Sequence, residues 1–173
     1  LGGAEAHASR SGVAHFAVED EAASFELTRQ ILSYIPSNNQ EAPPVIPPTD
    51  DPMRMDAALD TFIPEDPNVP YNIKTVLEHV FDKGSILEVM PTFAPNVVVG
   101  FGRLHGHPVG IVANQPEYMA GAIDIDASDK IARCVRFCDA FNIPLVTFCD
   151  TPGFMPGVMQ EHGGIIRHGA KVI

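Results

Sequence analysis

The stretch Ile143–Lys171, IPLVTFCDTPGFMPGVMQEHGGIIRHGAK, joins a short apolar run to a helical pattern through a loop rich in proline and glycine. The run Ile143–Phe148 is continuous and partly β-branched, which is typical of a strand covered on both faces. Proline fixes φ and gives up a donor, whereas glycine lets a ligand approach bare N–H groups. Because such groups can hold an oxyanion, we expect a binding edge here. An ordinary tight connection would explain the same residues.

The rest of the chain predicts an α/β unit around this stretch. The expected elements follow from the spacing of hydrophobic residues, from Pro36, which ends a helix, and from a turn at His105 and Gly106. They are helices over Glu19–Ile35, Asn72–Phe81 and Asp126–Asn142, a strand over Ile86–Met90, and a hairpin of Asn96–Leu104 with Pro108–Asn114. In the third helix we expect Asp126 as the N-cap and an inward stripe of Ile131, Cys134 or Val135, Cys138 and Phe141.

Composition limits the function classes. The 173 residues are 45% hydrophobic and carry a net charge of -11, so the chain can bury a core and has little affinity for nucleic acid or anionic membranes. We expect no membrane span and no secretory leader, and therefore a cytoplasmic protein, or a mitochondrial matrix protein if the source is eukaryotic. Three cysteines fit a reducing compartment, with Cys134 and Cys138 in the core. No CxxC pair is present, and we expect no metal.

The segment from Pro43 to Pro70 has the composition of a linker. It holds eight of the 16 prolines, interleaved with acidic residues. The chain opens on Leu1 without a methionine and closes at Ile173 inside a helical pattern. We therefore expect a piece of a longer subunit.

Five long motifs point to one family. They are LGGAEAH (1–7), SGVAH (11–15), LSYIPSNN (32–39), FAPNVVVGFGRLHGHPVGIVANQP (93–116) and CDAFNIPLVTFCDTPGFMPGVMQEHGGIIRHGAK (138–171). Together they resemble the β, or carboxyltransferase, subunit of biotin-dependent acyl-CoA carboxylases, with propionyl-CoA carboxylase as the nearest type. The resemblance runs from end to end and is weakest across residues 40–68.

The resemblance implies the crotonase or Clp-protease-like fold, which these subunits contain twice. Residues 1–44 would be the end of the N-terminal repeat, residues 45–67 the Pro- and Asp-rich linker, and residues 68–173 most of a truncated C-terminal repeat. It also implies a hexameric core that works with a biotin carboxylase or biotin carrier subunit.

The implied reaction moves a carboxyl group from carboxybiotin, carried on a partner protein or domain, to the α carbon of a short-chain acyl-CoA such as propionyl-CoA. Carboxybiotin releases CO2, N1 of biotin takes the α-proton, and the enolate attacks CO2. Two oxyanions need backbone N–H groups rather than a strong side-chain base. In the family, Gly-Gly-Ala type turns supply the two main pairs. We expect them before Leu1 and after Ile173, so no catalytic residue is assigned within the chain, and Gly2-Gly3-Ala4 is a different motif.

By the same resemblance, the loop after Phe148 lines the biotin or acyl pocket. We expect the N–H groups of Gly153, Phe154 and Gly157 to line it, with Gln160, Glu161 and Gly163 shaping the start of the next helix. The Phe154 ring would lie near biotin or the acyl group. A Phe that fills a core gap under the loop is the alternative.

Other chemistry finds less support. The last serine is Ser128, and neither Thr147 nor Thr151 has an evident His partner, which argues against a hydrolase. His105 and His107 fit an exposed turn better than a metal site. An acid/base cluster of Glu161, His162 and Arg167 and a set of helix-surface groups are equally compatible with the sequence. Two rival functions stay open: the carboxyltransferase subunit of a sodium-pumping decarboxylase, and a non-catalytic assembly subunit.

Overall fold

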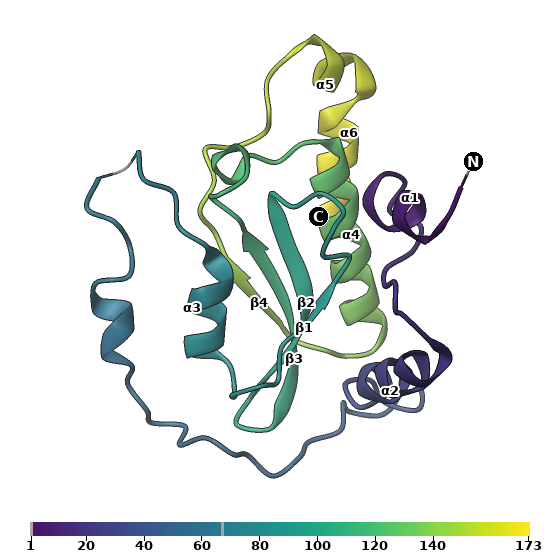
Figure 1. Cartoon of the computed structure of the whole chain (residues 1–173), viewed down its shortest axis with the longest axis vertical. Coiled ribbons are helices and arrows are strands. Elements are labelled where there is room, and N and C mark those ends of the chain that lie inside the picture. Colours follow the sequence, from purple (N-terminus) through teal and green to yellow (C-terminus); the bar gives the residue numbers. More distant parts are fainter. Residues whose placement is uncertain (1, 67) are drawn as a thin grey trace.

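The structure, a computed structural model, describes residues 2–66 and 68–173. Leu1, the first residue of the predicted segment 1–44, and Pro67, the last residue of the predicted linker, lie outside the described residues. Four strands form one sheet in the order β1 (Leu87–Val89), β2 (Val97–Leu104), β3 (His107–Asn114) and β4 (Leu145–Phe148). The first two pairings are antiparallel and the last is parallel. A parallel pair needs a crossover, which α4 (Ile125–Ala140) supplies (Figure 1).

The predicted hairpin is confirmed. Leu104 pairs with His107, which leaves His105 and Gly106 as a two-residue turn with φ values of 50° and 79°. Positive φ at both central positions matches the twist of the two strands. The Asp82 carboxylate accepts hydrogen bonds from the N–H groups of both turn residues, at 2.9 and 2.7 Å. His105 and His107 are both exposed, as expected of a turn rather than a core.

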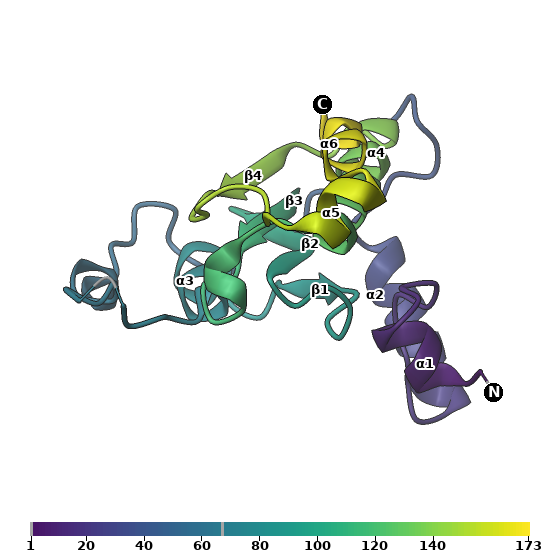
Figure 2. The same ribbon diagram turned by 90° about the horizontal axis from the view of Figure 1, so that it is seen from above.

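The sheet is covered by one helix on each face, α3 (Ile73–Val80) and α4 (Figures 1 and 2). Because alternate side chains of a strand point to opposite faces, β2 and β3 supply both cores. The α3 side consists of Ile73, Leu77, Phe81, Val98, Val109, Ile111 and Ala113. The α4 side is built around Val97, Val99, Val112, Ala127 and Ile131. Cys138 is fully buried and Cys134 is partly buried against the α4 core, so the core prediction for both is confirmed.

The predicted start of the long helix is wrong by two residues. Asp124, not Asp126, is the N-cap of α4, and its carboxylate accepts the Ala127 N–H at 2.8 Å. Both aspartates suit the positive end of a helix, but only the cap can reach the free N–H groups of the first turn. Asp126 is exposed in that first turn.

The expectation that β4 is covered on both faces is also wrong. Val146 and Phe148 pack toward the α3 core, whereas Leu145 and Thr147 are exposed. β4 is the last strand of the sheet, and α4 contacts β2 and β3. The face of β4 that carries Leu145 and Thr147 is therefore largely open rather than covered.

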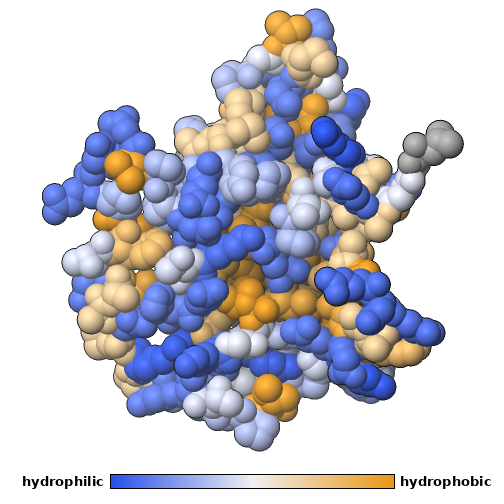
Figure 3. Space-filling view, in the orientation of Figure 1, coloured by the Kyte–Doolittle hydropathy of each residue, from blue (hydrophilic) through white to orange (hydrophobic). Residues whose placement is uncertain are grey.

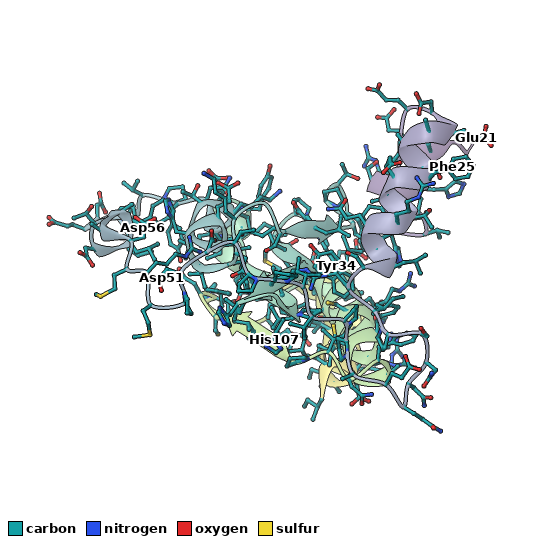
Figure 4. The ribbon with its side chains drawn as sticks, turned by 90° about the horizontal axis from the view of Figure 1, so that it is seen from below. Glu21, Phe25, Tyr34, Asp51, Asp56 and His107 are labelled. Atoms are coloured by element: carbon teal, nitrogen blue, oxygen red, sulfur yellow. The ribbon has the colours of Figure 1, made fainter. Side chains whose placement is uncertain are left out.

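The N-terminal part adds two helices, α1 (Ala4–Ser9) and α2 (Glu21–Leu32), so the second begins and ends inside the predicted range. Leu27, Ile31 and Ile35 pack beside the buried Tyr34. The opposite side of α2, with Glu21 and Phe25, projects from the rest of the chain (Figure 4).

Buried Arg103 holds the N-terminal part to the sheet. Its guanidinium donates to the carbonyls of Ser33, at 2.7 Å, and Pro44, at 3.0 Å, and lies 4.7 Å from the centre of the Tyr34 ring. A single side chain thus bonds the end of the α2 segment and the start of the expected linker.

Residues 45–66 run from the hairpin turn to α3 as a largely extended chain with one short helical turn, η1 (Ala57–Asp60) (Figure 1). The Ile46 N–H donates to the Gly106 carbonyl at 3.2 Å. Asp56 bonds His79 of α3. Of the helices that the structure describes, none has the length and apolar character needed to cross a bilayer.

Beyond β4 the chain forms α5 (Val158–Gly163), α6 (Ile165–Gly169) and a last turn, η3 (Ala170–Val172). The sequence predicted one helix here. Gly164, at φ 87°, turns the chain between α5 and α6, because a left-handed residue cannot continue a right-handed helix.

Candidate functional site

The candidate site lies where β3 and β4 end. The two strands are parallel, so their carboxyl ends meet at one edge of the sheet, which is where open α/β sheets bind ligands. Asn114 is the last residue of β3 and is buried. Its side-chain amide donates to the Gly121 carbonyl at 3.1 Å, and its carbonyl accepts the Asp150 N–H at 3.2 Å. One side chain therefore joins the two segments that leave the strands.

Further bonds hold the same two segments side by side. The Ile123 N–H donates to the Gly153 carbonyl at 3.0 Å, and the Met155 N–H donates to the Ile123 carbonyl at 2.8 Å. At the far end, the Gln160 side-chain oxygen accepts the Ile125 N–H at 3.0 Å. The loop of the candidate site is thus bonded along its length to the chain that leads into α4.

The three predicted N–H groups differ in what they can bind. The Gly153 N–H already donates to Thr151 Oγ1 at 3.1 Å. The N–H groups of Phe154 and Gly157 have no acceptor within the described part of the chain. Positive φ values of 124° at Gly153 and 131° at Gly157 show why both positions are glycine. Two N–H groups, rather than the expected three, are open to a ligand.

Phe154 is not a core residue. Its side chain is 53% exposed, which argues against a ring that fills a gap under the loop. The far edge of the ring lies on Gly169 of α6, where an added Cβ would come within 2.4 Å of the ring. The ring is thus supported from one side and open on the other.

The other predicted residues lie on α5, and not all at its start. Gln160 is engaged by Ile125, as described above, and Glu161 is exposed. Gly163 is the last residue of α5, where a Cβ would meet the Ile125 side chain at 2.5 Å. The prediction that Gly163 shapes the start of the helix is therefore wrong. The absence of a side chain at Gly163 instead allows the end of α5 to pack closely on the start of α4.

Of the two interpretations left open for Glu161, His162 and Arg167, the structure favours helix-surface groups, because no hydrogen bond or ion pair joins these residues to one another in the described part of the chain. The titratable cluster is one turn further on. Asp129 accepts from His168 at 2.8 Å and from Lys171 at 2.8 Å. Burial raises the pKa of Asp129, but the bonds from Lys171 and His168 outweigh it and leave the pKa below its usual value.

Lys130 was missed by the sequence reasoning. It is fully buried, and its ammonium donates to the carbonyls of Phe93, Ala94 and Val97 at 2.7, 3.2 and 2.7 Å. Burial lowers its pKa to about 8. The available signal was its position on the same helical stripe as Cys134, where a charged residue is unusual.

Two further features shape the edge. The Tyr71 hydroxyl donates to the Asp150 carboxylate at 2.7 Å, and burial with this bond raises the tyrosine pKa to about 12. After β3, the turn η2 (Met119–Gly121) is left-handed, with φ of 51° and 52° at Met119 and Ala120. Two successive non-glycine residues in this region are strained, and such strain gathers at functional sites.

The tip formed by α5 and α6 carries exposed apolar side chains beside charged ones. Val158, Met159 and Ile166 are 67%, 83% and 73% exposed, and hydrophobic side chains lie at the top of Figure 3. Together with Phe154, they give the candidate loop an apolar outer surface.

A mixed sheet between two helices, with a glycine-rich loop after the parallel strand, is the architecture of crotonase-like carboxyltransferases. The chain belongs to the carboxyl transferase domain family, whose sequence profile matches residues 1–173.

The relatives that match along the entire chain include the following two. One is the propionyl-CoA carboxylase, carboxyltransferase subunit of Haloferax mediterranei, at 56% identity. The other is the methylmalonyl-CoA decarboxylase subunit alpha of Veillonella parvula, at 53% identity. In both cases the match spans 34% of the relative's length, so the chain covers about a third of the proteins it resembles.

A solved structure agrees with the fold. Transcarboxylase 12S, crystallised as a hexamer with methylmalonyl-coenzyme A bound, superimposes with a TM-score of 0.95 at 48% identity. The match covers 98% of this chain and 32% of that one. A single-chain, multi-domain long-chain acyl-CoA carboxylase superimposes with a TM-score of 0.84 at 29% identity, over 99% of this chain and 16% of its own length.

Proposed function

We propose that the protein containing this chain is a carboxyltransferase that moves a carboxyl group from carboxybiotin to the α carbon of propionyl-CoA. The observation that carries the proposal is 56% identity over all 173 residues to a propionyl-CoA carboxylase subunit. Two more of the relatives, the decarboxylase subunit and transcarboxylase 12S, are named for methylmalonyl-CoA or were solved with it bound. Methylmalonyl-CoA is propionyl-CoA with a carboxyl group on its α carbon, so one substrate and product pair fits all three.

The candidate site suits a reaction with oxyanions and little need for a side-chain base. Phe154 and Gly157 offer unpaired N–H groups among the described residues, and the open face of the Phe154 ring offers an apolar surface. Donors that are held in place stabilise developing negative charge without having to reorient. The bonds from Asn114 and Ile123 supply that rigidity.

Biotin supplies the carboxyl group and, at N1, the base, and we place it on a partner protein or domain. The chain's own residues would bind and orient it: the Phe154 ring against its apolar part, and the N–H groups beside the ring toward an oxygen. Glu161 and Gly163 would act on the same loop through α5. We infer that the two main oxyanion pairs lie outside these 173 residues, in the rest of the intact subunit.

The whole protein would follow its relatives in organisation. We propose that residues 1–44 are the end of the N-terminal crotonase-like repeat and that residues 68–173 form most of the C-terminal repeat. Residues 45–67 would be the linker between the two repeats. The functional assembly would be a hexamer that works with a biotin carboxylase or biotin carrier subunit. Three free cysteines favour the cytoplasm, or the mitochondrial matrix if the source is eukaryotic.

The test is carboxylation by the intact subunit together with a biotin carboxylase and biotin carrier from the same genome. With ATP, labelled bicarbonate and propionyl-CoA, we expect labelled methylmalonyl-CoA. Omitting the intact subunit controls for the other components. Absence of product in either direction, with a correctly assembled hexamer, would leave only the assembly role and would refute the proposal.

One alternative has a specific observation in its favour, namely 53% identity to a methylmalonyl-CoA decarboxylase subunit. It uses the same site in the opposite direction. Decarboxylation of methylmalonyl-CoA without ATP, stimulated by sodium and dependent on membrane partners, would select it. ATP-dependent carboxylation without sodium dependence would select the carboxylase.

A further inference from the structure

Gly169 is a buried glycine that helix geometry does not require. It is the last residue of α6, with φ -60° and ψ -38°, which any L-residue adopts in a helix. Alanine is preferred to glycine at such a position. A reason for the glycine must therefore come from what lies against it.

The neighbour is the Phe154 ring. A Cβ added at Gly169 would lie 2.4, 2.7 and 3.4 Å from Cζ, Cε1 and Cε2 of Phe154, and ordinary contact begins at about 3.4 Å. Apart from the adjoining backbone of its own helix, no other described atom lies as close to that Cβ. The three atoms form the far edge of the ring, so the ring meets α6 end-on and would have to move by about 1 Å to make room.

The ring can move only outward. Its backbone is fixed on one side by the pairing of Ile123 with Phe154, and the ring is 53% exposed on the other. Helix α6 itself is held, because Ile165 is buried and Asp129 of α4 bonds both His168 and Lys171. A larger residue at position 169 would therefore displace the ring into the space beside the loop.

We propose that Gly169 is a positioning residue for Phe154: the missing side chain sets how far the ring projects into the carboxyltransfer site. This inference rests on the proposed function. Displacement of a group that contacts substrate by about 1 Å reduces rates by up to about 100-fold. Gly169 touches no substrate in this arrangement and acts only through the ring.

The experiment compares four forms of the intact subunit: wild type, Gly169→Ala, Phe154→Leu and the double variant. Leucine has no atoms at the positions of Cζ, Cε1 and Cε2, so it leaves room for an alanine at position 169. Gly3→Ala is the matched control, because Gly3 has φ 165° and no atom within 4 Å of an added Cβ. Each form is assayed for kcat/KM of carboxyl transfer and for its thermal unfolding midpoint.

We expect Gly169→Ala to lower kcat/KM by about 10- to 100-fold when position 154 is phenylalanine, and by less than about twofold in the Phe154→Leu background. In the Phe154→Leu background, we expect Gly169→Ala to raise the unfolding midpoint, because the helix prefers alanine. When position 154 is phenylalanine, we expect the same change to raise the midpoint by less, or to lower it. Gly3→Ala should leave both readouts unchanged.

Two results would overturn the proposal. An equal loss of transfer in both backgrounds would mean that Gly169 acts through something other than the ring. Equal shifts of the midpoint in both backgrounds would mean that the two residues are not coupled. The unfolding midpoints test the coupling of Gly169 and Phe154 even if none of the four forms catalyses transfer. Absence of transfer in all four forms, including the wild type, would refute the proposed function and not the coupling.

Discussion

Phe154 is the residue on which the placement of the site depends most. Its ring is exposed and supported by α6, so its loss should affect ligand contact rather than folding. We predict that Phe154→Ala in the intact subunit lowers carboxyl transfer at least about tenfold and leaves the hexamer intact, with an unfolding free energy changed by less than about 1 kcal/mol.

A buried phenylalanine gives the comparison for this variant. Phe81 is fully buried, and Phe81→Ala should cost about 3 to 5 kcal/mol of stability. The measurements are kcat/KM and urea unfolding. A stability loss for Phe154→Ala as large as that for Phe81→Ala would identify the ring as a core residue.

Lys130 makes stability depend on pH. Its native pKa is lowered to about 8, below the usual value near 10.5, so between these pH values the unfolded chain holds a proton that the native chain has lost. Stability rises with pH wherever the unfolded state binds more protons. Below about pH 8 both states are charged, and the cost of burying the charge is present in full.

We therefore predict that the unfolding free energy of the wild type, relative to Lys130→Met, increases from about pH 8 to about pH 10. At about pH 7 the variant should be less stable by on the order of 3 kcal/mol, because the carbonyls that Lys130 binds are left unpaired. Urea unfolding at steps of one pH unit over this range measures both effects. A difference that narrows as pH rises would contradict the lowered pKa.

Among the elements, the pairing of the two segments that leave β3 and β4 is the feature that shapes the candidate site. Asn114 both donates and accepts, which no carboxylate can do at neutral pH. We predict that the nearly isosteric Asn114→Asp loses about 2 to 3 kcal/mol of stability, because it faces the Gly121 carbonyl with an acceptor in a buried place.

Asn39→Asp is the matched control for this change. Asn39 is exposed, so the same chemical change there should alter stability by less than about 0.5 kcal/mol. Denaturant midpoints of the two variants provide the test. If Asn114→Asp is no more harmful than Asn39→Asp, the side chain does not hold the two segments together.

The sequence predicted the elements better than their surroundings. The α3 helix, the hairpin and the β4 strand follow from local spacing and turn chemistry, and all were found within a few residues. The N-cap at Asp124 was missed because two aspartates two residues apart are equally good caps. The open face of β4 and the buried ammonium of Lys130 depend on packing between distant segments, which periodicity does not encode.

The candidate loop has the feature for which the sequence singled it out, since it carries N–H groups without an acceptor among the described residues close to the end of a strand. What the sequence could not give was the identity of the free groups. The Gly153 N–H already donates to Thr151 Oγ1, and Gly163 allows the close contact between α5 and α4. Both facts arise from side chains that meet only after folding.

For the whole molecule, we predict that a polypeptide of these 173 residues alone does not transfer a carboxyl group. If both main oxyanion holes lie elsewhere in the subunit, two losses of about 3 kcal/mol each reduce the rate by at least about four orders of magnitude. We also expect no micromolar binding of coenzyme A, because the net charge of -11 disfavours its phosphates.

Hydrogen exchange first confirms that the polypeptide is ordered, and calorimetry and a transfer assay beside the intact subunit then follow. Turnover by this polypeptide would place the main oxyanion holes inside it. Micromolar binding of coenzyme A would show that local cations outweigh the net charge.

The most direct measurement is a structure of the intact subunit with biotin and propionyl-CoA bound. We predict that the biotin ring system or the acyl group lies within about 4 Å of the open face of the Phe154 ring, with an oxygen within hydrogen-bond distance of the Phe154 or Gly157 N–H. Ligands bound away from the edge formed by the ends of β3 and β4, with the Phe154 ring in contact with protein only, would contradict the placement of the carboxyltransfer site.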